Sequence, residues 1–193
     1  EDFGERVRHL EPELRKATAK AVNETADAVL QGLVPVIEEA FDEPTDFTLD
    51  AFAATKARPT REPSALVYMK DEQYSYLKYH IEGGARTGGG KYDHLVTGGV
   101  VVPGSGAELD EHGNFPDSYI EFAEANGGWW MTTRGGDMGL FRRDANGNVE
   151  AVAIVTDKVV YRRRLAVSES IRKIVEEVLP EKVVKGVAAM FDE

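Results

Sequence analysis

The 193-residue sequence contains no cysteine, and this absence removes several classes of site. A chain without thiols forms no disulfide bond, no thiolate metal centre and no cysteine nucleophile. Its longest apolar runs fall far short of the roughly 20 residues of a membrane-spanning helix, and no signal peptide is recognisable. We therefore expect neither a membrane partner nor a cysteine-based enzyme.

Positive charge is also in short supply. The chain has 23 Lys and Arg residues against 34 Asp and Glu residues, which gives a net charge of −11 at pH 7. Affinity for nucleic acid rests on Lys and Arg neutralising phosphates, so we expect no DNA binding through bulk attraction. An acidic surface either repels DNA or meets basic partners.

Motifs for catalysis and cofactor binding are missing as well. The glycine-rich stretch 82–91 fails as a P-loop, because Ala85 stands where the first glycine is needed and Tyr92 follows the lysine. The turn 144–148 begins like a calcium loop, but Val149 replaces the required glycine. No Gly-x-Ser-x-Gly or His-Glu-x-x-His sequence exists. We therefore nominate no catalytic, cofactor-binding or metal-binding residue, and we interpret the histidines as structural: His9, His80, His94 and His112.

The remaining composition is that of an ordinary globular protein, with 42% hydrophobic and 30% charged residues. The length predicts a single domain over residues 1–193. Within it we expect a long N-terminal helix in 1–43, a β-rich body in 44–165 and a C-terminal helix in 166–193. This organisation predicts the α+β class, with an antiparallel β-sheet and short helices between the two long ones.

Apolar residues recur every three or four positions over residues 10–41, which predicts one amphipathic helix. An earlier start at Asp2 is also compatible with the sequence, because Glu5 follows at the spacing of a capping box. Thirty helical residues span about 45 Å, whereas a compact domain of this length has a radius of gyration of about 16 Å. The helix therefore either crosses the body or projects from it. Its small residues suit either the core or close packing against a neighbouring subunit: Ala17, Ala21 and Ala28.

Past this helix the apolar pattern changes from the helical period of 3.6 residues to a period of 2. Pro44 disfavours helical dihedrals at the residue before it, so the helix is expected to end at residues 41–42. The alternation then predicts a strand over 47–54, with Phe47 and Leu49 facing the core. Replacing either side chain with Ala should then cost about 2–4 kcal/mol.

The following segments alternate between strand and helix signals. We expect a flexible loop at 82–91 and a hairpin around Asp144–Asn148. The final helix should begin at Ser168, a good N-cap, and kink or split at Pro180. The other expected elements are strands at 65–70 and 95–102, helices at 71–81 and 116–125, and hairpin strands at 139–143 and 149–156.

Two further groups are candidate subunit contacts. Trp129 and Trp130 are neighbours in a predicted strand, so only one of them can point into the core face of a sheet. The other lies at a surface or a contact. A second group, Arg162, Arg163 and Arg164, is expected to pair with carboxylates in so acidic a chain.

One motif and several shorter stretches follow each other in order along nearly the whole chain. The motif comes after the long helix and consists of Phe41, Asp42, Pro44, Thr45, Phe47, Thr48 and Leu49. The shorter stretches are Val67–Asp71, Ile81–Arg86, Val102–Gly104, Leu109–Asn114, Gly139–Arg143 and Tyr161–Arg162. Together they resemble the prophage minor tail proteins similar to minor tail protein Z.

The resemblance implies a structural virion protein at the neck or head-proximal end of a phage tail, present in the host cytoplasm during assembly. It implies a tail-completion-like α+β fold, a ring of identical subunits, most simply a hexamer, and contacts with other neck and tail proteins. DNA would be only passing cargo, and no catalysis or cofactor is implied. In such a ring we expect acidic side chains to outnumber basic ones on the inner wall, and the three arginines to lie at subunit contacts. Two other classes stay open: a small soluble enzyme with an Asp/Glu/His pocket formed only in three dimensions, and a monomeric β-sheet binding module.

Overall fold

The computed structural model describes residues 3–191, and their side chains from Leu10 onward. The chain forms two compact units. Unit 1 combines residues Glu1–Ile81 with Arg164–Glu193, and unit 2 comprises Glu82–Arg163. The expectation of a single domain did not anticipate this division, because the two parts of unit 1 lie at opposite ends of the sequence.

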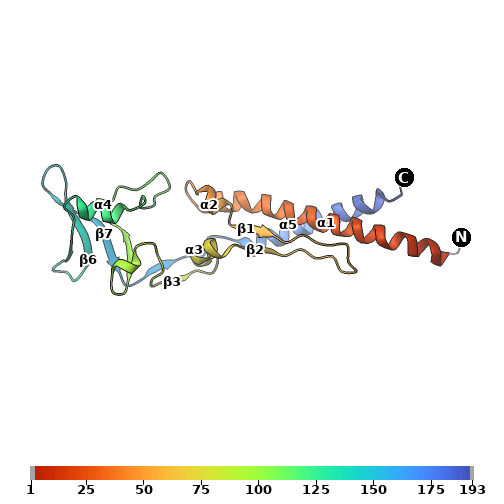
Figure 1. Cartoon of the computed structure of the whole chain (residues 1–193), viewed down its shortest axis with the longest axis horizontal. Helices are drawn as coiled ribbons and strands as arrows, with labels where there is room; N and C mark the ends of the chain where they lie inside the picture. The colour runs from red at the N-terminus through yellow and green to blue at the C-terminus, as the bar shows by residue number, and fades with distance from the viewer. Residues whose placement is uncertain (1–2, 192–193) are drawn as a thin grey trace. The chain divides into compact units, whose positions relative to one another are not determined.

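Unit 1 is built on two long antiparallel helices, α1 (Phe3–Ala40) and α5 (Val167–Ala188). Figure 1 shows α1 in red and orange beside α5 in blue. With 38 residues α1 is about 57 Å long. Its residues Val29, Leu33 and Ile37 recur at four-residue spacing and are each 1% exposed, so they form the spine of the unit's core. The predicted long helix and its end near residue 41 are confirmed.

The C-terminal helix differs from expectation at two points. It begins at Val167 with Ala166 in the cap position, so Ser168 is not its N-cap. Pro180 lies inside the helix, which continues to Ala188 without being split. Of its residues only Val167 is buried, so the apolar residues along the rest of α5 stay at least partly exposed.

The strand predicted over residues 47–54 is wrong in its first half. Residues Asp46–Leu49 form the short helix α2, because Thr45 caps it by accepting a hydrogen bond from the Thr48 amide at 3.2 Å. Phe47 is 49% exposed and does not anchor the core, whereas Leu49 is half-buried and packs against it. The strand β1 begins only at Phe52 and ends at Ala54.

A two-stranded ribbon and one helix complete unit 1. β1 pairs in antiparallel fashion with β2 (Val67–Met69), with Ala53 opposite Tyr68. The predicted helix after β2 is α3 (Asp71–Glu82), whose buried Leu77 joins the core around Leu33 and Leu165.

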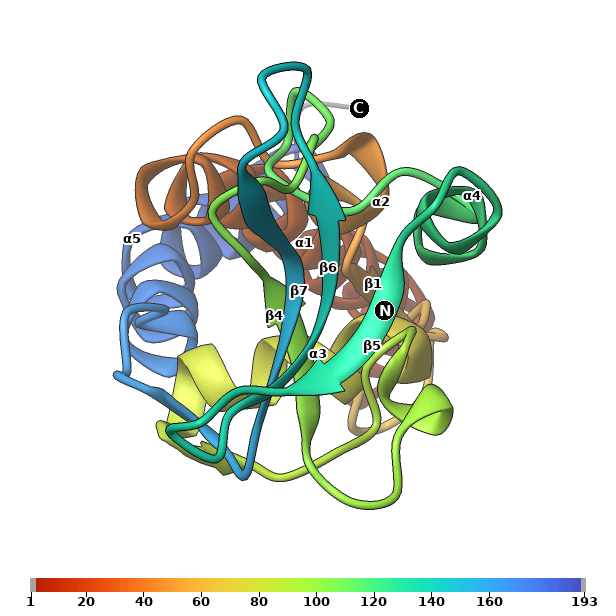
Figure 2. The same ribbon diagram turned by 90° about the vertical axis from the view of Figure 1, so that its left-hand side faces the viewer.

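Unit 2 contains a four-stranded antiparallel sheet in the order β4-β7-β6-β5. Its strands are β4 (Val100–Pro103), β5 (Trp129–Thr132), β6 (Met138–Arg143) and β7 (Val149–Thr156). Figure 2 shows β6 and β7 side by side in this sheet. The helix α4 (Tyr119–Ala125) supplies the buried Ile120 and Ala123, which join Leu140 and Val152 of the sheet in one core. The predicted hairpin is confirmed, and the Asp144 carboxylate closes its turn by accepting from the amides of Asn146 and Asn148.

The glycine-rich stretch is more ordered than a flexible loop. It contains β3 (Gly84–Arg86), which pairs with β8 (Val159–Tyr161). A 3-10 turn, Asp93–Leu95, follows. The buried Asp93 carboxylate accepts hydrogen bonds from the Gly90 amide at 2.7 Å, the Val101 amide at 2.8 Å and Arg86 Nη1 at 3.1 Å. One carboxylate therefore ties the loop to the start of β4. These elements confirm the predicted α+β class.

Candidate functional site

The motif residues 41–49 form the turn that joins α1 to the ribbon of unit 1. Glu43 adopts a left-handed φ of 45°, which reverses the chain just before Pro44. The Thr48 hydroxyl lies 3.0 Å from both the Thr45 hydroxyl and the Tyr76 hydroxyl of α3. Gln73 of α3 donates to the Phe47 carbonyl at 3.0 Å. The motif thus contacts α3 through polar groups as well as through Phe41 and Leu49, and these contacts fix the turn between α1 and the ribbon.

A second part of this junction surrounds His80, which lies near the end of α3. The Phe41 ring meets the imidazole edge-on, with the ring centres 4.9 Å apart. Arg164 Nε donates to His80 Nδ1 at 2.9 Å, and its guanidinium lies 4.4 Å from the centre of the Phe41 ring. The His80 carbonyl also accepts from the amides of Arg164 and Leu165. His80 therefore holds the returning chain against α3 through both its ring and its backbone.

Burial and the neighbouring Arg164 cation lower the pKa of His80 from 6.5 to about 4. The neutral imidazole accepts from Arg164 at Nδ1, so its proton sits on Nε2. Burial also raises the pKa of Tyr76, against the opposing effect of its hydrogen bond with Thr48. Both groups are therefore uncharged at neutral pH.

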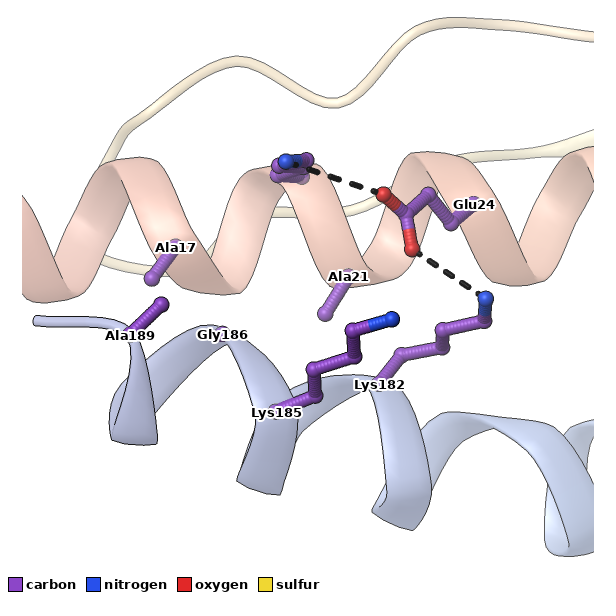
Figure 3. Close-up of a pocket in the computed structure, with 8 residues that line it drawn as sticks. Ala17, Ala21, Glu24, Lys182, Lys185, Gly186 and Ala189 are labelled. Carbon is purple, nitrogen blue, oxygen red and sulfur yellow. Dashed lines mark ion pairs between the residues drawn. The ribbon is translucent and has the colours of Figure 1, made fainter. Parts of the chain in front are cut away.

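The small residues expected at a subunit contact are used partly within the chain. A β-carbon on Gly186 of α5 would lie 3.6 Å from the β-carbon of Ala17, and Ala21 is only 1% exposed. Figure 3 shows Ala17 and Ala21 facing Gly186 and Ala189 across the two helices. Their close packing therefore joins α1 to α5 of the same chain. Ala28, further along α1, is half-buried.

Charged side chains flank this small-residue seam in a pocket of about 160 Å³. Glu24 lies 3.3 Å from Lys182 and 4.0 Å from Lys20, the two ion pairs dashed in Figure 3. Lys185 also lines the pocket and makes no ion pair with the described residues. The paired side chains are at least 30% exposed, so each pair contributes less than about 1 kcal/mol. The pocket is locally basic in an acidic chain, but its polar groups are solvated.

The other flank of the α1–α5 seam carries an apolar groove of about 260 Å³. Its only polar lining group is Thr25, whose hydroxyl donates to the Ala21 carbonyl at 2.8 Å and is thereby satisfied. Such a surface favours an apolar ligand or side chain. The groove is lined by Val22, Thr25, Ala26 and Val29 of α1, by Ala65 and Val67, and by Ile171, Val175 and Leu179 of α5.

The two tryptophans lie on β5, an edge strand of the unit 2 sheet. Trp130 packs against the core, and its indole nitrogen donates to Glu124 of α4 at 2.5 Å. Trp129 lies on the other face, opposite Phe141 of β6, and its indole nitrogen contacts the Met131 sulfur at 3.1 Å. Both side chains are half-buried. The sequence correctly predicted that the pair would divide between the two faces.

The three arginines do not act as one cluster. Arg162 and Arg163 belong to unit 2, and Arg164 belongs to unit 1. Within the chain Arg164 contacts His80 and Phe41 rather than a carboxylate. The prediction of an acidic partner is therefore wrong for Arg164 within the chain. Whether any of the three meets a neighbouring subunit remains a prediction.

Sequence reasoning missed the apolar groove and the His80 junction. Each is assembled from three segments far apart in the chain, and no local pattern joins them. One signal was available for the groove: Ile171, Val175 and Leu179 form a second apolar row on α5 at four-residue spacing, beside the row that faces α1. A helix with two such rows has more apolar surface than one neighbouring helix can cover.

Among residues 3–191 no group of three or more His, Asp or Glu side chains is arranged to hold a metal ion. In the same range no helix combines the length and the apolar character needed to cross a membrane. No protein-family model, curated protein or solved structure matches this chain.

Proposed function

We propose that the chain is a structural subunit of a closed ring at the neck or tail-completion region of a phage virion, where identical copies, most simply six, join the tail to the head. The motif at residues 41–49 and its position after a long helix motivate the proposal. The observation that carries it is the size of the surface that the single chain leaves exposed.

The chain exposes 12824 Å². Two separate compact units of the sizes found here, touching nowhere, would expose only about 10,900 Å² by the scaling of folded monomers. The excess is therefore about 1,900 Å². A ring subunit contributes two contact surfaces of about 800 Å² each at the standard interface size. The excess matches what a pair of subunit contacts would cover.

The composition of this surface also supports assembly. Large apolar side chains remain exposed along both long helices and the ribbon of unit 1, including Leu14 at 45%, Leu66 at 63% and Val184 at 68%. Scattered exposed apolar residues are normal on a monomer. Here they accompany an open apolar groove on the same unit, and that combination is typical of an interaction surface.

The charge of both units suits a channel that lets DNA pass. Unit 1 has 15 basic and 22 acidic residues, a net charge of −7, and unit 2 has 8 and 12, a net charge of −4. Neither unit has the cationic surplus that neutralises phosphates. In the proposed ring DNA is passing cargo rather than a ligand.

Three measurements test this function. A virion reconstruction should place a ring of this protein between head and tail, and phage lacking the gene should accumulate unjoined heads and tails. The purified protein should bind DNA weakly in filter binding at low salt. Virions complete without the protein would refute the proposal, and submicromolar DNA affinity would refute the sliding-channel role.

A further inference from the structure

The apolar groove of unit 1 is bordered by an unpaired strand edge. The Thr55 amide donates to the Leu66 carbonyl, and the Lys70 amide donates to the Ala51 carbonyl. Residues 66, 68 and 70 thus turn their backbone groups toward β1, and by the alternation of an antiparallel ladder Val67 turns its groups away from β1. In the part of the chain that the structure describes, the ribbon has two strands, and no other strand pairs with this edge.

The groove lies beside that edge. Ala65 and Val67 line it, no residue of β1 does, and Ile171 and Leu179 of α5 supply its opposite wall. The Val67 side chain therefore faces the groove while its backbone N–H and C=O remain available. This combination accepts an extended segment, because the backbone edge binds the added strand and the groove takes an apolar side chain.

Leu109 of unit 2 is the side chain of this chain that best fits such a site. It is 42% exposed and lies outside helices and strands. Its backbone N–H has no partner among the described residues. In the other large exposed apolar residues outside helices and strands the backbone N–H is already bonded. The Leu66 N–H donates to the Thr55 hydroxyl, and the Phe191 N–H donates to the Ala188 carbonyl.

Charge favours the same pairing. Leu109 is flanked by Glu108, Asp110 and Glu111. The segment that leads into the groove wall carries Arg58 and Arg61, both exposed and without an ion pair among the described residues. Opposite charges beside an apolar contact fix the register and orientation of the partner.

We propose that Leu109 of one subunit inserts into the groove of its neighbour while residues 107–110 add a third strand beside β2. Leu109 then stands opposite Val67, with the Leu109 N–H donating to the Val67 carbonyl and the Val67 N–H donating to the Leu109 carbonyl. This inference rests on the proposed ring and names its contact. The inserting segment lies on unit 2 and the groove lies on unit 1, so the two subunits use different surfaces. Such a heterologous contact is the kind that closes a ring.

The absence of native cysteine allows a direct test. Val67→Cys and Leu109→Cys are made in separate chains carrying tags of different mass, mixed, and oxidised mildly. Directly opposed antiparallel residues have α-carbons about 4.5–5.5 Å apart, inside the range of about 4.4–6.8 Å for disulfides. We expect a disulfide between the two differently tagged chains. Tyr68→Cys mixed with Leu109→Cys is the matched control, because Tyr68 points to the opposite face and its backbone pairs with β1.

A second variant measures what the contact contributes. Leu109→Asp should raise the protein concentration needed for half-assembly at least tenfold, whereas Leu95→Asp, at a similarly exposed leucine of unit 2, should leave it unchanged. Suppose that the wild type forms a ring. If the Val67→Cys and Leu109→Cys chains then form no disulfide above the control, or if Leu109→Asp assembles normally, this contact is overturned and the ring still stands. A wild-type protein that forms no ring alone or in particles would instead overturn the proposed function.

Discussion

Replacing His80 should change how the stability of unit 1 depends on pH. In the folded chain the imidazole is buried and accepts a hydrogen bond from Arg164 at Nδ1. Protonation would place an N–H where Nδ1 now accepts and would put two cations in contact. The folded state therefore favours the neutral ring, whereas the unfolded chain protonates it at its ordinary pKa.

The sign and size of the effect follow from the two pKa values. Burial and Arg164 lower the pKa of His80 from 6.5 to about 4. Above pH 6.5 neither state is protonated there, and the stabilising contribution is fully present. As the pH falls from 6.5 to 4 only the unfolded state binds the proton, so stability is lost. Each pKa unit corresponds to about 1.4 kcal/mol, so the loss approaches about 3 kcal/mol by pH 4.

Urea unfolding of the wild type and of His80→Gln provides the assay. Glutamine retains an oxygen that can accept from Arg164 but does not titrate, so the difference between the proteins isolates the imidazole from titrating carboxylates. The signal should be far-ultraviolet circular dichroism, because the two long helices lie in unit 1 and both tryptophans lie in unit 2. The advantage of the wild type should shrink by about 3 kcal/mol between pH 7 and pH 4. Parallel curves for the two proteins would refute the reasoning.

Four further substitutions test the packing within each unit. Ala21→Leu should lower stability by about 1–3 kcal/mol by overpacking the α1–α5 seam, and an unchanged urea midpoint by circular dichroism would show that the helices separate easily. Asp93→Ala leaves the largely covered Arg86 without its carboxylate partner, so the free energy of unfolding of unit 2, followed by tryptophan fluorescence, should fall by up to about 3 kcal/mol. Phe47→Ala should cost less than about 1 kcal/mol and Leu77→Ala about 2–5 kcal/mol, because Phe47 is 49% exposed and Leu77 is 0% exposed. Equal costs at these two positions would contradict the assignment of α2.

Local periodicity was sufficient for the long helices and for the hairpin. The apolar row ending at Val29, Leu33 and Ile37 keeps the helical spacing, and the buried row of α1 follows it. The hairpin was recognisable because Asp144–Asn148 has turn chemistry between two predicted strands, and the Asp144 carboxylate accepts hydrogen bonds from two amides of the turn. In these segments the local preference and the tertiary fold agree.

The strand predicted at residue 47 failed because alternation over six residues is weak evidence beside a helix cap. Thr45 offers its hydroxyl to the Thr48 amide, and one turn of helix forms. The apolar residues of that turn are then distributed by helical geometry, so Phe47 turns to solvent and Leu49 to the core. The pairing of β1 with β2 could only begin after that turn.

The division into two units could not be predicted from the composition either. The glycine-rich stretch 82–91 begins directly after Ile81, but nothing in it shows that the chain leaves unit 1 there and returns at Arg164. The connection is closed by the His80 carbonyl, which accepts from the amides of both Arg164 and Leu165 at 2.8 and 3.0 Å. A backbone carbonyl leaves no signature in a sequence, because every residue has one.

The groove of unit 1 was still harder to predict from the sequence, because it depends on a strand edge that has no pairing strand. Its lining comes from α1, from Ala65 and Val67, and from α5, so it exists only because α1 and α5 pack as antiparallel neighbours. Its strand edge is open only because the ribbon ends after β2. An open edge beside an apolar groove is a liability in a monomer, since any extended chain can pair with it. In the ring that we propose, this edge is buried against an identical neighbour, so the liability becomes an assembly contact, and the acidic residues around Leu109 restrict which segment can enter.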